Sequence, residues 1–136
     1  MAELREAAVR VTGVFASPEA CDRIPEAHRV APEEAMLLGD PPADLETAVR
    51  ELDPDALLLD VSDGWDLLEL DGEDVREVFA RVSELELPDR GFVQGEVARV
   101  GVRVLVEGDR LRLLVPAMWT EHLRERILAD AAELLR

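Results

Sequence analysis

The stretch that decides the fold is "LLLDVSDGWDLLELDGED" (Leu57–Asp74), where apolar runs alternate with acidic turns. "ALLLDVS" and "WDLLELD" each have the composition of a strand, and the Asp63-Gly64 pair between them favours a β-hairpin. After Asp71-Gly72, apolar residues recur at helical spacing, which predicts a helix. Asp71 is the predicted N-cap of this helix, with Asp74 three residues on, and Leu87-Pro88 marks its predicted end.

The carboxylates of this stretch also raise the question of a calcium loop. Such a loop needs oxygen ligands at positions 1, 3, 5 and 12 around a glycine at position 6. With Gly64 at position 6, Leu59 and Leu70 occupy positions 1 and 12. With Gly72 there, Leu67 and Val78 occupy them. Both registers fail, so we expect these acids to set turns rather than to hold a metal.

Composition limits the classes of partner. The chain has 136 residues, which predicts a single domain over 1–136, and its net charge of −16 opposes binding to nucleic acid and to anionic membranes. All fifteen bases are arginine, which removes Schiff-base and P-loop chemistry. Cys21 is the only cysteine, and "MAELREAAVR" lacks the apolar segment of a signal peptide. We therefore expect a cytoplasmic protein without a membrane span or an internal disulfide.

The rest of the chain predicts further strands and helices. Residues 17–34, with three prolines, predict an irregular connection with one helical turn. The other expected elements are strands at 9–16 and 34–40, a helix from Asp40-Pro41-Pro42 to Asp53, an antiparallel meander over 91–116, and a final helix after Pro116. This order predicts an α+β fold, a mainly antiparallel sheet with about three helices packed on it.

Five residues are candidates for ligand or partner binding, and no catalytic constellation is evident. Asp60 ends a strand, so its carboxylate either accepts N–H groups of the Ser62–Gly64 turn or meets a ligand. Trp65 and Trp119 are core residues or exposed interface anchors. Arg103, like Arg99, either reaches an anion beside the sheet or faces solvent, because strand alternation allows both positions. The candidates are Asp60, Ser62, Trp65, Arg103 and Trp119.

The stretch "LLLDVSDGWDLLELDGEDVREVFARVSELEL" resembles the "D-[LV]-S … L-x-G-x-D-A-x-x-x-L" segment of the folate-binding aminomethyltransferase-like superfamily. Within that group the chain is most similar to the gamma subunits of heterotetrameric sarcosine oxidases. "VAPEEAMLLGD" stands where those proteins have "L-G-P-D-E-W-L-L-L". In the later "V-x-R-S-[FY]-A-x-Y-L" motif, Met118 replaces the usual serine and Trp119 provides the aromatic residue. The resemblance spans about residues 30–135, and residues 1–30, an N-terminal strand and connection, match least.

The resemblance implies an accessory role in a complex. In aminomethyltransferases a carboxylate in "G-G-x-x-D-D" approaches the folate, whereas "ARVGVRVLV" (Ala98–Val106) has no acid there. Gamma subunits also lack it, bind no flavin, and join larger subunits that hold the cofactors. The resemblance therefore implies larger oxidase or aminomethyltransferase-like partners, with tetrahydrofolate as the one cofactor it suggests. A stand-alone folate-type or other small-ligand module and a homodimer stay open, and an enzyme acting on its own ranks last.

Overall fold

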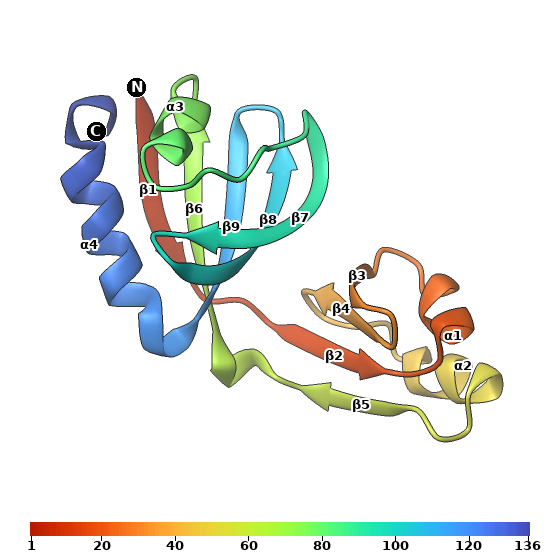
Figure 1. Cartoon of the computed structure of the whole chain (residues 1–136). Helices are drawn as coiled ribbons and strands as arrows, with labels where there is room; N and C mark the ends of the chain where they lie inside the picture. Colours follow the sequence, from red (N-terminus) through yellow and green to blue (C-terminus); the bar gives the residue numbers. More distant parts are fainter. The chain divides into compact units, whose positions relative to one another are not determined.

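The computed structural model describes residues 1–136, which form two compact units (Figure 1). Unit 1 consists of Met1–Ala8 and Asp63–Arg136, and unit 2 consists of Val9–Ser62. Unit 2 is thus inserted into unit 1 at a single point of the sequence. That the whole chain folds as a single domain stays a prediction, because compactness does not report whether the two units unfold together.

Unit 1 is a five-stranded antiparallel sheet with two helices. The strand order is β1-β6-β9-β8-β7. Its strands are β1 (Ala2–Ala7), β6 (Trp65–Gly72), β7 (Arg90–Val97), β8 (Val100–Glu107) and β9 (Arg110–Pro116). Its helices are α3 (Val75–Ala80) and α4 (Thr120–Asp130). Its 3₁₀ turns are η1 (Ser62–Gly64), η2 (Ala117–Trp119) and η3 (Ala132–Leu134), and the first residue of η1 belongs to unit 2. The meander of β7, β8 and β9 and the helix after Pro116 confirm the sequence-based prediction.

The core of unit 1 lies between the helices and one face of this sheet. Alternate residues of β8, Val102, Val104 and Val106, point into it because side chains alternate along a strand. Phe79 of α3 and Ile127 of α4 meet them from the helical side. The opposite face of the sheet carries the intervening residues, among them Trp65 and Arg103, and this alternation places the two candidates away from the core.

Unit 2 is a four-stranded antiparallel sheet in the order β3-β4-β2-β5. Its elements are β2 (Val11–Phe15), α1 (Pro18–Asp22), β3 (His28–Ala31), β4 (Glu34–Leu38), α2 (Leu45–Leu52) and β5 (Leu57–Asp60). Both helices cover one face of the sheet, where Val14, Leu37 and Val49 form a second core. Cys21 lies in this core, its thiol donates to the carbonyl of Ala16 at 3.6 Å, and burial raises the pKa of the thiol.

The predicted hairpin at Asp63-Gly64 is wrong. β5 pairs with β2 in unit 2, whereas β6 pairs with β1 and β9 in unit 1. A two-residue hairpin of the Asp-Gly kind needs positive φ at both turn residues, and neither Asp63 nor Gly64 has it. They lie instead in the 3₁₀ turn η1, so the stretch that looked like one hairpin joins two sheets.

The predicted start and end of helix α3 are also wrong. Asp71 belongs to β6, and Asp74 is the residue before the helix but makes no capping hydrogen bond with its side chain. Asp74 instead pairs with the N-terminal amine at 3.1 Å. The helix ends at Ala80, and the backbone carbonyl of Val82, two residues on, accepts the N–H of Ala98 in the β7–β8 turn at 2.7 Å.

Two strands were not anticipated, β1 in the charged N-terminal segment and β3 inside the proline-rich connection. The helical turn expected in that connection is the short helix α1, and α2 begins a few residues later than Asp40-Pro41-Pro42 suggested. Its end at Asp53 is as predicted. The α+β class is confirmed, with two antiparallel sheets where the sequence suggested a single one.

Candidate functional site

Asp60 and Ser62 form a local hydrogen-bonded loop at the end of β5. The carboxylate of Asp60 accepts the Ser62 hydroxyl at 2.5 Å and the Ser62 backbone N–H at 3.0 Å. These two hydrogen bonds, and then the nearby Arg10, lower the pKa of Asp60. The Ser62 hydroxyl oxygen also accepts the backbone N–H of Val11 at 2.8 Å. The pair therefore ties the end of β5 to the start of β2.

Trp65 and Arg103 lie against each other on the helix-free face of the sheet of unit 1. Both flank β9, because Trp65 pairs with Pro116 and Arg103 with Leu114. The guanidinium carbon of Arg103 is 4.3 Å from the centroid of the Trp65 ring, which is a cation–π contact. The two side chains line an open cavity of about 470 Å³ together with Gln94, Glu96 and Val102.

Trp119 is the aromatic residue of the η2 turn between β9 and α4. Its side chain is 45% exposed, and the preceding Met118 is 82% exposed. The Trp119 ring meets His122 edge to face, with centroids 6.0 Å apart. The next residue, Thr120, holds the turn to β6 through a 2.6 Å hydrogen bond to the carboxylate of Asp66. Met118 and Trp119 thus form an exposed apolar projection on a fixed backbone.

The five predicted residues therefore belong to three places. Asp60 contacts Ser62 in unit 2, and Trp65 contacts Arg103 in unit 1. Trp119 lies apart from that pair along the chain, on η2, with His122 as its ring neighbour. Arg99 lies in the β7–β8 turn, at a φ of 68°. No group of three or more His, Cys, Asp or Glu side chains has a metal-binding arrangement.

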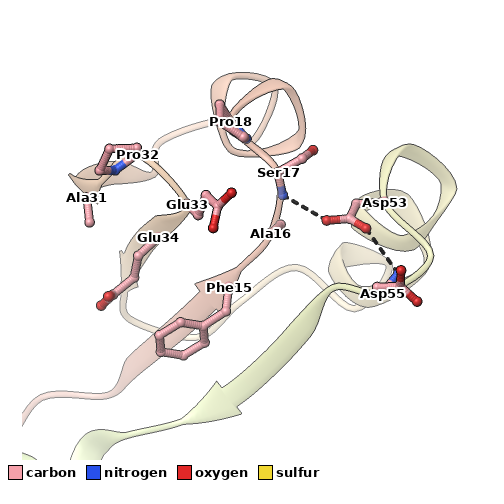
Figure 2. Close-up of a pocket in the computed structure, with 10 residues that line it drawn as sticks. All are labelled: Phe15, Ala16, Ser17, Pro18, Ala31, Pro32, Glu33, Glu34, Asp53 and Asp55. Carbon is pink, nitrogen blue, oxygen red and sulfur yellow. Dashed lines mark hydrogen bonds between the residues drawn. The ribbon is translucent and has the colours of Figure 1, made fainter.

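A further cavity, of about 750 Å³, lies in unit 2 and was not anticipated from the sequence. Figure 2 shows Phe15 beside it, with Glu33 and Glu34 on one side and Asp53 and Asp55 on the other. Asp53 is held in place, since its carboxylate accepts the N–H of Ser17 at 2.7 Å and of Asp55 at 3.0 Å. The lining contains four carboxylates and no arginine, so the cavity is suited to a cation.

The sequence offered a weak signal for this cavity. Asp53-Pro54-Asp55 was interpreted only as a helix end, and Phe15 only as the end of a strand. Their proximity depends on the pairing of β2 with β5, which was not predicted from the sequence. Correct strand pairing would have placed Phe15 opposite Leu57, two residues from Asp55.

Comparison with known proteins relates the fold to an oxidase. One chain of the heterotetrameric sarcosine oxidase from Corynebacterium sp. U-96, solved in complex with pyrrole 2-carboxylate, matches with a TM-score of 0.78. The match covers 97% of this chain and 84% of that chain at 18% identity. This chain has the fold of a sarcosine oxidase subunit. The resemblance inferred from short motifs is thereby confirmed for the fold, and it extends over residues 1–30, where the motifs gave least.

Other comparisons add little to the sarcosine oxidase-like fold. The C-terminal regulatory domain of aspartate kinase from Porphyromonas gingivalis W83 matches with a TM-score of 0.47 at 11% identity, covering 96% of both chains. The regulatory subunit of aspartate kinase from Thermus thermophilus gives 0.45 at 12% identity, covering 94% of this chain and 96% of that one. Both similarities are too low to support an argument. No protein-family model and no curated protein matches the sequence.

The four α-helices are short. None is long and apolar enough to cross a membrane.

Proposed function

We propose that this protein is a non-catalytic accessory subunit, similar to the gamma subunit of heterotetrameric sarcosine oxidase, that binds larger oxidase or aminomethyltransferase-like chains in the cytoplasm. The observation that carries the proposal is the fold match over 97% of the chain to a chain of a heteromeric oxidase. The segment Ala98–Val106, which lacks the carboxylate that aminomethyltransferases place near folate, supports a role without catalysis.

The exposed apolar projection of Met118 and Trp119 supports a role in assembly. Tryptophan, methionine and arginine are enriched in protein interfaces, and an exposed tryptophan on a fixed turn is a typical anchor. Met118 is 82% exposed and directly precedes Trp119, so the two side chains together offer an apolar surface to a partner. We therefore assign the projection to the interface with a larger chain.

Native purification tests this function. The protein, tagged in its own host at the natural expression level, is expected to elute in a larger assembly that contains a flavin-dependent oxidase or an aminomethyltransferase-like chain. Turnover of sarcosine is expected for the assembly and not for the isolated chain. Recovery of the protein only as a free monomer or homodimer would contradict the proposal.

A second candidate function, a folate-type binding module, is favoured by the cavity at Trp65 and Arg103. An aromatic ring beside a guanidinium suits a ligand with a flat ring and a carboxylate, and about 470 Å³ is within the usual range for ligand cavities. Calorimetric titration with tetrahydrofolate tests it: binding that is lost in Arg103→Gln would support it, and the absence of both heat and thermal shift would refute it.

A further inference from the structure

Four strands lie at the edges of the two sheets, and three of them are protected against pairing with another chain. β1 has the charged sequence "AELREA", and Arg136 donates a backbone hydrogen bond to its Ala2 at 2.9 Å. The β7 carbonyl of Glu96 accepts the hydroxyl of Ser83 at 2.7 Å. β3 carries a bulge between Arg29 and Ala31. Charges, covering groups and bulges are the usual protections of an edge strand.

β5 has fewer of these protections, because its one charged residue is Asp60 at the end of the strand. Its sequence is "LLLD", without a basic residue, a proline or a bulge. Val61 donates its N–H to the carbonyl of Val11 at 2.9 Å, and in an antiparallel pair such bonds recur at every second residue. Leu59 and Leu57 therefore direct their backbone groups toward β2. The N–H and C=O groups of Leu58 and Asp60 consequently point outward, ready to pair with a further strand.

The side chains next to this edge form a patch, which we call the apolar patch and define as Phe15, Leu57 and Leu59. They are 37%, 49% and 43% exposed, respectively, on the sheet face opposite α1 and α2. Phe15 is paired with Leu57, and Leu59 with Gly13, which has no side chain. The Phe15 ring covers Gly13, with a ring carbon 3.2 Å from the position that a Cβ would take. The three side chains are thus contiguous.

The apolar patch continues into the acidic cavity of unit 2, because Phe15 belongs to both. In Figure 2 the Phe15 ring lies beneath the carboxylates of Glu33 and Glu34, and Asp55 lies across from them. An aromatic face combined with several carboxylates suits a guanidinium or an ammonium group. The guanidinium of Arg29 already donates to the carbonyls of two lining residues, Pro18 at 2.9 Å and Pro32 at 3.0 Å. A partner that covers the apolar patch can therefore place a basic side chain in the cavity.

We propose that the β5 edge, the apolar patch and the acidic cavity together bind an extended segment of a larger partner chain, which adds a strand to β5. On the face that it turns toward the patch, this segment carries apolar side chains followed by arginine or lysine, because the patch and the cavity share the face of Phe15. This is strand addition, in which main-chain hydrogen bonds provide affinity and side chains provide specificity. It rests on the proposed function, since it names the surface through which unit 2 joins the assembly.

Charge decides between a different chain and a second copy of this one. Each copy has a net charge of −16, and a copy paired through β5 would bring its own Asp55 and Asp60 to the same edge. Like charges at a pairing edge oppose association. A basic segment of another chain is instead attracted to the same carboxylates.

The test uses the full chain and a blocked ten-residue peptide, with binding measured by fluorescence anisotropy. Every second residue of the peptide faces the patch, with valine at three of these positions and arginine at the next two, and threonine fills the positions between them. We expect binding that weakens at least tenfold when Leu57 and Leu59 are both replaced by lysine. The matched control replaces Leu52 and Leu128 by lysine, which are 43% and 40% exposed and lie outside the patch, so the net charge changes equally. A peptide with glutamate in place of arginine is expected not to bind.

Hydrogen exchange supplies the specific readout. Bound peptide should protect the amides of Leu58 and Asp60, which point outward, and leave the exchange of Leu59 unchanged. Equal binding by the two lysine variants, or no added protection at Leu58 and Asp60, would overturn the proposal. So would dimerisation of the free chain that the Leu57→Lys, Leu59→Lys variant abolishes, because the occupant would then be a second copy.

Native purification of the same double variant separates the two proposals. Loss of the larger assembly supports strand addition at β5. Retention of the assembly overturns it while the accessory function stands. If neither the variant nor the wild type assembles, the accessory function fails, and the peptide titration decides the β5 proposal alone.

Discussion

Single side chains hold the connections of this fold in place. Ser62 both donates to Asp60 and accepts from Val11, so one hydroxyl joins the end of β5 to the start of β2. Trp65 is similarly fixed by Arg103 above its ring, whereas Trp119 has only an edge contact with His122 and stays 45% exposed. Ser62 and Trp65 therefore each have a defined contact within the chain, whereas the exposed side chain of Trp119 is accessible to a partner.

The hydrogen bonds between Asp60 and Ser62 lead us to expect that the stability of the fold depends on pH. Hydrogen bonds from Ser62 lower the pKa of Asp60 in the folded chain, so its contribution is present above the ordinary aspartate pKa and is lost as the pH falls through the lowered value. We expect Asp60→Asn to be less stable than wild type at neutral pH, with the difference shrinking toward low pH. Urea unfolding at several pH values measures this. Asp63→Asn, in the same loop, is the control, and a difference that grows in acid would contradict the prediction.

Because Trp119 is exposed, we expect its replacement to weaken partner binding without lowering the stability of the fold. Truncating an interface anchor costs about 2 kcal/mol of binding free energy, which is roughly thirtyfold in affinity. Trp119→Ala should therefore weaken association with the larger chain by about that factor and leave the thermal midpoint nearly unchanged. The control is Leu128→Ala, on α4 and 40% exposed. Equal effects of both variants on association would argue against an anchor at Trp119.

At the scale of elements, periodicity predicted most strands and helices, whereas strand pairing was predicted only within the meander of β7, β8 and β9. The alternation in β8 and β9 and the adjacent turn at Gly108 specify a meander locally. β1 could not be found in this way, because only Ala2 is fully buried and three of the other five residues are charged. The Asp63-Gly64 pair led to a wrong prediction because its sequence favours a hairpin. In the structure β5 pairs with β2 and β6 pairs with β9, both distant in the sequence.

The candidate residues show the same division. The sequence predicts the hydrogen bond of Asp60 to its own turn, because aspartate commonly accepts the backbone N–H two residues on. Its donor, Ser62, lies within the same short loop. The contact of Arg103 with Trp65 and the cavity beside Phe15 depend on which strands are neighbours. No local pattern of the sequence encodes them.

The close packing of β1 on β6 leaves no room for a side chain at Gly72. It has a φ of +130°, and a Cβ there would stand 2.4 Å from the carbonyl oxygen of Met1. Gly72→Ala should lower the free energy of unfolding by about 2 kcal/mol or more, since strain and a backbone clash combine. Gly108→Ala, at φ +60° with no neighbour within 4 Å, should cost only about 1 kcal/mol. Chemical denaturation compares the two, and equal losses would be inconsistent with the clash.

For the whole molecule, the two cores raise the question of how many unfolding steps there are. Both tryptophans lie in unit 1, so their fluorescence reports on unit 1 alone, whereas circular dichroism reports on both units. Leu37, 6% exposed in the core of unit 2, should cost about 2–5 kcal/mol when replaced by alanine. If the chain is one cooperative domain, Leu37→Ala shifts the fluorescence and dichroism midpoints together. A shift in dichroism alone would mean that unit 2 unfolds separately, and exposed Leu52→Ala should shift neither.

The rate at which Cys21 reacts with a thiol reagent reports how often unit 2 opens. Cys21 is the only thiol, it is buried in the core of unit 2, and burial raises its pKa, so the reactive thiolate is scarce in the closed state. Ellman's reagent should therefore modify the folded chain only as fast as unit 2 opens. The labelling rate therefore measures the opening rate of unit 2. Slower labelling after a partner binds would show that assembly slows this opening.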